Sequence, residues 1–194
     1  MTWRDLFVAK HPDVYEPSDD TFLLADVVEA NVGAGDRFVE VGCGAGLVAM
    51  AAAHAGASVV ATDRNMHAAR LTQHNAQENR LRMDVVCTDL LAGLTRRFDV
   101  AAFNPPYLPT APDEHVDGPL DWAFDGGPDG NVVALRFARQ VMGLGVPKVL
   151  VIHSSLSDPG PLVAHMEAAG YASSIAAEQA LPYEQLTVRR FDAD

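Results

Sequence analysis

Lysine and cysteine are scarce in this chain of 194 residues. Lys10 and Lys148 are the only lysines, and 14 basic residues stand against 26 acidic ones, for a net charge of −12. Such a surface repels a phosphate backbone, so broad nonspecific nucleic-acid binding is not expected. The two cysteines, Cys43 and Cys87, are too few for a zinc site, and we expect them to be reduced thiols.

Long apolar runs are also absent. The alanine-rich segment 48–57 is internal and too short to cross a bilayer, and the N-terminal sequence MTWRDLFVAK lacks the layout of a signal peptide. We therefore expect a cytoplasmic protein with one domain over residues 1–194, in which residues 1–35 form an N-terminal segment and helix. The seven histidines are scattered. None pairs with another ligand at a local metal-binding spacing, so no metal site is expected.

Apolar runs alternate with amphipathic stretches along the chain, a pattern typical of a parallel sheet covered by helices. Strands are expected at 37–41, 58–62, 84–88, 98–103 and 146–153, followed by an antiparallel hairpin of 172–178 and 185–191. Helices are expected after an N-cap at Ser18 and over 47–55, 66–78, 132–142 and 161–169. The loop 104–130 is long for a structureless connection, which indicates an active-site loop.

A glycine-rich turn, Glu40-Val-Gly42-Cys43-Gly44-Ala-Gly46, joins the first expected strand to a helix. Glycines let the backbone turn tightly and bring its N–H groups close to a ligand. In Rossmann-like folds an acid about 20 positions further on binds ribose hydroxyls, and Asp63 ends the second strand there. Asp89 ends the third strand and can accept from an adenine amino group. These acids favour a nucleoside cofactor without phosphates.

The fourth expected strand ends in Asn104-Pro105-Pro106-Tyr107. Ligands of open α/β sheets bind beyond the carboxyl ends of strands, so this tetrapeptide should face the cofactor. The prolines hold the turn rigid and leave the Pro105 carbonyl free to accept, beside the side-chain oxygen of Asn104. Two acceptors can hold both hydrogens of one planar NH2 group and aim its lone pair. The structural alternative is a plain proline-rich turn.

Taken together, these motifs resemble the HemK/PrmC-like family of class I S-adenosylmethionine-dependent methyltransferases, in particular its archaeal and eukaryotic branch. The resemblance covers nearly the whole chain: it begins at the segment Val14-Tyr-Glu-Pro-Ser-Asp-Asp-Thr-Phe-Leu-Leu24, continues through Trp122-Ala, Gly126-Gly and Asp129-Gly130, and includes the C-terminal hairpin. It implies an α/β, Rossmann-like fold, whose seven-stranded, mostly parallel sheet has one antiparallel strand and helices on both faces. It also implies methylation of the glutamine amide in the Gly-Gly-Gln loop of a class I peptide chain release factor, with S-adenosylhomocysteine as the second product.

The resemblance assigns roles by motif position. Residues expected to contact the cofactor are Tyr15, Pro17, Thr21, Glu40, Gly42, Cys43, Gly44, Gly46, Asp63, Arg64, Asp89, Leu90 and Asn104. Residues expected to contact the substrate are Asn104, Pro105, Pro106 and Tyr107, of which Asn104, Pro105 and Tyr107 form the catalytic set. Trp122 and glycines 126–130 are expected to shape the substrate mouth, whereas His115, His153 and Ser154 receive no role.

The resemblance also bears on partners. Bacterial members use an N-terminal helical domain to dock the release factor, but here only 14 residues precede the Tyr-Glu-Pro motif. Docking is therefore expected to use the long loop or a partner. Archaeal and eukaryotic relatives work with a small zinc-binding activator subunit, which pairs with an edge strand. The apolar strand containing Met83, Val85, Val86 and Cys87 would lie at such an edge, so we expect a heterodimer.

Three other functions stay open at this stage. A DNA adenine N6-methyltransferase uses the same tetrapeptide, but it needs a basic groove for a flipped base. A protein lysine methyltransferase is a further alternative, although an amine does not need two acceptors. A non-catalytic scaffold that binds the cofactor is the alternative from another functional class.

Overall fold

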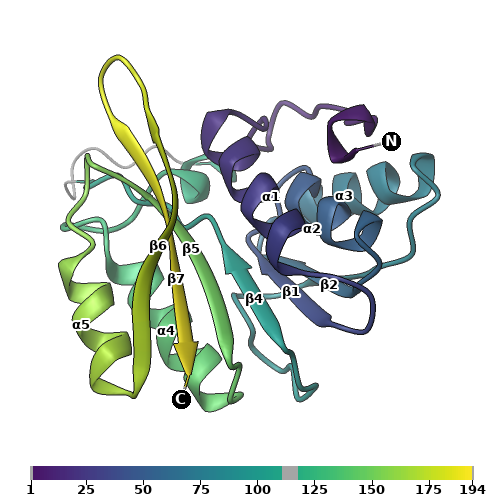
Figure 1. Cartoon of the computed structure of the whole chain (residues 1–194). Coiled ribbons are helices and arrows are strands. Elements are labelled where there is room, and N and C mark those ends of the chain that lie inside the picture. The colour runs from purple at the N-terminus through teal and green to yellow at the C-terminus, as the bar shows by residue number, and fades with distance from the viewer. Residues whose placement is uncertain (1, 111–117, 194) are drawn as a thin grey trace.

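The computed structural model describes residues 2–110 and 118–193, and these include one seven-stranded sheet in the order β3-β2-β1-β4-β5-β7-β6 (Figure 1). The strands are β1 (Arg37–Val41), β2 (Ser58–Asp63), β3 (Asp84–Cys87), β4 (Val100–Phe103), β5 (Lys148–Ser154), β6 (Tyr171–Ala180) and β7 (Gln185–Ala193). The helices are α1 (Asp19–Asn31), α2 (Leu47–His54), α3 (Met66–Glu78), α4 (Val132–Gly143) and α5 (Gly160–Ala168). Two short 3₁₀ turns, Trp3–Asp5 and Asp121–Ala123, complete the described elements.

Helices cover both faces of the sheet (Figure 1). Side chains alternate between the faces along each strand. Phe38 of β1 and Leu150 of β5 therefore pack with α1 and α2, whereas Val39 and Val149, their neighbours in sequence, pack with α4. The α3 helix lies on the same side as α1 and α2 (Figure 1). The sheet is thus the middle layer of three, as expected.

Strand β7 is the one antiparallel strand of the sheet. It pairs antiparallel with both β5 and β6, while β1, β2, β3, β4 and β5 pair in parallel. Chain order reverses between β1 and β4, because β2 and β3 extend the sheet on one side and β4 and β5 on the other. Such a reversal opens a crevice at the carboxyl ends of the strands, where ligands of this architecture bind.

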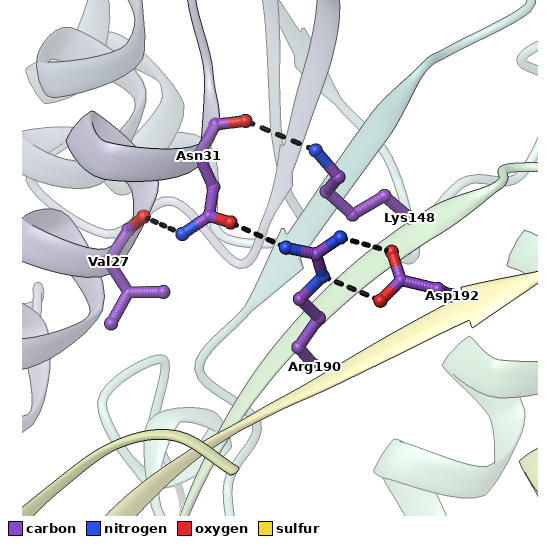
Figure 2. Close-up of polar contacts among 5 residues, drawn as sticks. All are labelled: Val27, Asn31, Lys148, Arg190 and Asp192. Atoms are coloured by element: carbon purple, nitrogen blue, oxygen red, sulfur yellow. Dashed lines mark hydrogen bonds and ion pairs between the residues drawn. The ribbon is translucent and has the colours of Figure 1, made fainter. Parts of the chain in front are cut away.

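A polar network fastens the end of α1 to the antiparallel part of the sheet (Figure 2). Asn31 is the last residue of α1, and its carbonyl accepts from the Lys148 ammonium of β5 at 3.3 Å. Its side-chain oxygen accepts from Arg190 of β7, whose guanidinium also forms two hydrogen bonds with Asp192. One of the two lysines therefore satisfies a helix-end carbonyl that has no partner within the helix.

The sequence-based element boundaries agree with the structure to within about two residues at most ends. Strand 37–41 and helix 66–78 have the predicted bounds. The fourth strand begins at Val100 instead of 98. Phe98 and Asp99 lie in the segment that leads into it, where the Asp99 N–H donates to the Arg37 carbonyl. Among the described residues, no helix has the length and apolar content needed to cross a bilayer.

Candidate active site

A cavity of about 460 Å³ lies at the carboxyl ends of β1, β2, β3 and β4, where the strand order predicts a ligand site. This volume is typical of small-molecule and cofactor sites. The cavity wall contains nearly all of the residues expected from the sequence: Tyr15, Pro17, Thr21, Glu40, Gly42, Cys43, Gly44, Asp63, Arg64, Asp89, Leu90, Asn104, Pro105, Pro106 and Tyr107.

Gly46 is the exception, because it does not line the cavity. It lies at the N-cap of α2 with φ of +85°, and a Cβ there would come within 2.6 Å of the Thr72 side chain. Gly46 is thus needed for the start of α2 and its packing on α3. Gly42, by contrast, lies in the wall with φ of +63°, and a Cβ there would meet the ring of Phe103 at 3.0 Å. The close approach of these two groups requires glycine.

Two carboxylates hold the glycine-rich turn in place. Asp63 at the end of β2 accepts from the Gly44 N–H at 2.9 Å and from the Asn65 N–H at 2.8 Å. Glu40, only 4% exposed, accepts from the Ala49 N–H in the first turn of α2 at 2.7 Å. Burial raises the pKa of both carboxyls, and these N–H donors oppose the increase. The acids therefore shape the turn as well as line the cavity.

Asp89 has a partner that the sequence did not indicate. Its carboxylate forms an ion pair with Arg136 of α4, and both residues line the cavity. The next residue, Leu90, is buried with φ of +53°, in the left-handed region that a leucine rarely adopts. Such backbone strain is often found at ligand sites. The turn after β3 is thus held in a fixed, unusual shape beside the cavity.

Asn104 and Asp20 form the contact that organises the far side of the cavity. The Asn104 Nδ2 group donates to Asp20 Oδ2 at 2.9 Å, and the Asn104 Oδ1 atom accepts no hydrogen bond among the described residues. Asp20 is only 4% exposed and also accepts from the Tyr15 hydroxyl and from the N–H and hydroxyl of Thr21. All of these partners donate, so Asp20 acts only as an acceptor. It therefore binds the Nδ2 end of the Asn104 amide and leaves the Oδ1 end available to accept.

Two tyrosines surround this amide. Burial raises the pKa of the Tyr15 hydroxyl to about 12 and raises that of Tyr107 still further, and the Asp20 and Glu184 charges add to both shifts. Both phenols therefore stay protonated at neutral pH. Tyr107 can offer an aromatic face or a hydrogen-bond donor to a substrate, but it cannot serve as a base.

Aromatic contacts and glycines shape the mouth of the cavity. The Arg64 guanidinium lies 4.1 Å from the Trp122 ring centroid, a distance typical of cation–π pairing. The Tyr15 ring meets Phe124 edge-on. A Cβ on Gly126 would lie 2.7 Å from the Pro106 carbonyl oxygen, so this glycine packs directly on the tetrapeptide. Trp122 and Gly127 thus line the cavity, Gly126 packs behind its wall, and His115 lies outside the described residues.

Besides Arg136, sequence reasoning missed Asp20 and Glu184. Asp20 appeared only as an acid in the first turn of a helix, and its partner Asn104 lies far along the chain, so no local spacing connects them. Glu184 lies between β6 and β7, accepts a short hydrogen bond from the Ser154 hydroxyl and lines the cavity. Of the two adjacent acids that follow Ser18, Asp19 is exposed and Asp20 is buried, a difference that the residue types do not show.

Comparison with known proteins decides the family. The model of the methyltransferase small domain matches residues 7–115. A Methanocaldococcus jannaschii protein, provisionally named a protein N5-glutamine methyltransferase, is 37% identical, over 92% of this chain and 91% of its own length. This chain belongs to the HemK-like methyltransferases. Human methyltransferase HEMK2 is 35% identical, with 92% of this chain and 89% of the human protein covered.

A solved structure supports the assignment of this chain to the HemK-like family. The Encephalitozoon cuniculi Mtq2-Trm112 complex, described as responsible for methylation of the termination factor eRF1, contains a chain that superposes with a TM-score of 0.76 at 25% identity. The match covers 94% of this chain and 99% of that one. The expected fold and enzyme class are confirmed, and the methyl donor of the enzyme is S-adenosylmethionine.

An Asp20→Asn substitution should lower the rate of methyl transfer about tenfold to a hundredfold, the usual range for residues that orient an active-site group. The NH2 group of the new asparagine would face groups that donate to Asp20 in the wild type, including Asn104 Nδ2. The Asn104 side chain would then lose the acceptor that fixes its orientation. Steady-state kinetics should show a lower kcat, with the Kd for S-adenosylmethionine changed by less than about threefold. Asp19→Asn, at the exposed neighbouring acid, is the matched control and should leave kcat unchanged.

Proposed function

We propose that S-adenosylmethionine occupies the cavity described above and contacts the predicted cofactor residues that line it. The chemistry of the wall supports this proposal. Asp63 ends β2 and Asp89 lies in the turn after the neighbouring strand β3, where carboxylates can accept from ribose hydroxyls and an adenine amino group. Gly42 and Phe103, packed closely against each other, form part of the wall, and Glu40 supplies a further carboxylate. This set of groups fits a nucleoside without phosphates.

The proposed acceptor of the methyl group is the side-chain amide of a glutamine, in the Gly-Gly-Gln motif of a class I release factor. The observation that carries this proposal is the hydrogen bond from Asn104 Nδ2 to Asp20. It leaves Asn104 Oδ1 free as an acceptor beside the carbonyl of Pro105, in a turn whose prolines fix the backbone. Relatives named for glutamine methylation and for the termination factor eRF1 support the same substrate class.

The chain's own residues would activate the substrate by orientation. An amide nitrogen is a weak nucleophile because its lone pair is delocalised into the carbonyl group. Asn104 Oδ1 and the Pro105 carbonyl would each accept one of its hydrogens and stabilise the positive charge that develops on nitrogen. S-adenosylmethionine, when bound, supplies an electrophilic methyl group on sulfur. The nitrogen then releases one proton to solvent, so no strong base is needed, in agreement with the protonated state of Tyr107.

A transfer assay with labelled S-adenosylmethionine tests the substrate. Purified release factor, double-stranded DNA and histone are offered side by side, and mass spectrometry locates the methyl group on the labelled product. We expect incorporation into the release factor alone, at the glutamine of Gly-Gly-Gln. Labelling of adenine or lysine at a comparable rate would contradict the proposal, and binding without any transfer would favour a scaffold. The net charge of −12 disfavours the DNA arm.

We further propose that a small zinc-binding activator subunit pairs with β3 in the cytoplasm. Strand β3 has a neighbour on one side only, β2, and therefore presents an unpaired edge. Its Val85 and Val86 are half-buried, so the edge is apolar. The Mtq2 chain, which has a related fold, was solved as a complex with Trm112. Addition of a strand at such an edge is a common mode of recognition.

A proline at position 85 should abolish assembly with this activator. The Thr88 N–H bonds to Asp63 of β2, so by alternation the backbone N–H of Val85 points away from β2, toward the open edge. Val85→Pro removes that donor and keeps the β2 pairing, while Val85→Ala shortens the side chain and keeps the donor. Co-purification should be lost for the proline variant alone. A chain that is soluble, monomeric and fully active without any partner would contradict the heterodimer.

A further inference from the structure

His67 of α3 lies close to His11 and Asp13 of the N-terminal segment, beside the cofactor cavity, although it is far from both of them in the sequence. One nitrogen of each imidazole and one carboxylate oxygen of Asp13 lie within 4.8 Å of one another. The two rings stack with centroids 4.8 Å apart, and His11 Nδ1 lies 3.9 Å from Asp13 Oδ2. No metal site was expected from the sequence, because only His11 and Asp13 are neighbours there and the third residue, His67, comes from another element.

The positions of these side chains are fixed by asparagines of the α3 region. Asn65, the N-cap of α3, donates to the Asp13 carbonyl at 2.7 Å, and its own side-chain oxygen accepts from the His67 N–H at 2.9 Å. Asn75, which is fully buried, accepts from the Ala9 N–H at 2.9 Å. Both segments that supply ligands are therefore held against each other before any ion binds, which lowers the entropic cost of forming a site.

The His11 ring lies beside Asp13. Its Nδ1 atom accepts from the Asp13 N–H at 3.2 Å and lies 3.9 Å from the Asp13 carboxylate, and a bound ion would replace this N–H at the nitrogen lone pair. Two imidazoles and one carboxylate form a ligand set typical of zinc and related first-row divalent cations. In a tetrahedral site the ligand atoms lie about 3.4 Å apart, so small rotations of these partly exposed side chains bring them into range.

We propose that His11, Asp13 and His67 bind one divalent transition-metal cation that joins the N-terminal segment to α3. Asp13, Val14 and Tyr15 form part of the cavity wall, so the ion would stiffen this wall from the outside. Three protein ligands leave a fourth position for water. The site is separate from the methyl-transfer residues around Asn104, and it does not depend on which substrate the enzyme methylates.

Calorimetric titration of the full chain with Zn²⁺, after removal of any purification tag, tests this proposal. Wild type should bind one added ion, and saturating Zn²⁺ at about a hundredfold excess over Kd should raise Tm by roughly 5 °C. His11→Ala and His67→Ala should each bind the ion at least about tenfold more weakly. His74→Ala, at an exposed histidine two turns along the same helix, is the matched control and should bind as wild type does.

Equal Zn²⁺ affinity in the wild type and in both His11→Ala and His67→Ala would overturn the proposal, because the ion would then bind elsewhere, for example at the exposed Cys87. Absence of any Zn²⁺ binding by the folded wild type would also overturn the proposal. The contact between the His11 and His67 rings would then be ring stacking alone. Asp13→Asn provides a third variant that keeps both rings and the backbone contacts. It should weaken Zn²⁺ binding while leaving the circular dichroism spectrum unchanged.

Discussion

An Asn104→Ala variant should transfer methyl groups about 10³-fold more slowly than wild type, the upper end of the loss caused by removal of one oriented hydrogen-bonding group. The substitution removes the acceptor Oδ1 and leaves the Pro105 carbonyl as a single acceptor. With one hydrogen free, the substrate amide can rotate away from the geometry needed for attack. The rate is measured with saturating release factor and labelled S-adenosylmethionine.

The affinity for the cofactor separates this loss from unfolding of the site. Asn104 is one of many residues around the cavity, so calorimetry should give a Kd for S-adenosylmethionine within about fivefold of wild type. Retention of more than a tenth of the wild-type kcat would be incompatible with the two-acceptor account.

Replacement of Asp63 by alanine should weaken S-adenosylmethionine binding about a hundredfold or more, because hydrogen bonds to a charged group contribute about 1.5–3 kcal/mol each. The variant loses the carboxylate proposed to hold the ribose hydroxyls. It also leaves the Gly44 and Asn65 N–H groups without their acceptor, so the glycine turn relaxes. Calorimetric titration with S-adenosylhomocysteine gives the Kd without turnover.

Asp63→Asn is the informative companion of this variant. It retains the size of the side chain and one acceptor oxygen, so it can still receive one of the two N–H groups. We expect a Kd between those of wild type and Asp63→Ala. A Kd for the alanine variant within tenfold of wild type would mean that the cofactor does not depend on this carboxylate.

Much of the fold could be read from local patterns. Strand β1 was predicted with its observed bounds because its residues are nearly all buried and Gly42 ends the run. Helix α3 was likewise predicted with its observed bounds from its amphipathic pattern, and the structure adds Asn65 as its N-cap. The strands of the final hairpin extend further than predicted, since residues near their ends pair in the ladder in spite of polar side chains.

Site residues at the ends of strands were predicted from the sequence. Those that depend on contacts between distant elements were missed. Asp63 and Asn104 each follow directly from the end of an apolar strand. The role of Asp20 depends on contact between α1 and the turn after β4, and the pairing of Asp89 depends on Arg136 of α4. Local sequence patterns hold no information about such tertiary contacts. The cluster of His11 with His67 was missed for the same reason.

The proposed methyl transfer depends above all on how the Asn104 amide is oriented toward the substrate. A crystal structure with S-adenosylhomocysteine and a glutamine peptide from the release factor measures this directly. The glutamine nitrogen should lie about 3 Å from both Asn104 Oδ1 and the Pro105 carbonyl oxygen, with Asn104 Nδ2 still bonded to Asp20. A glutamine amide held by other groups, or an adenosine bound outside the cavity, would contradict the account.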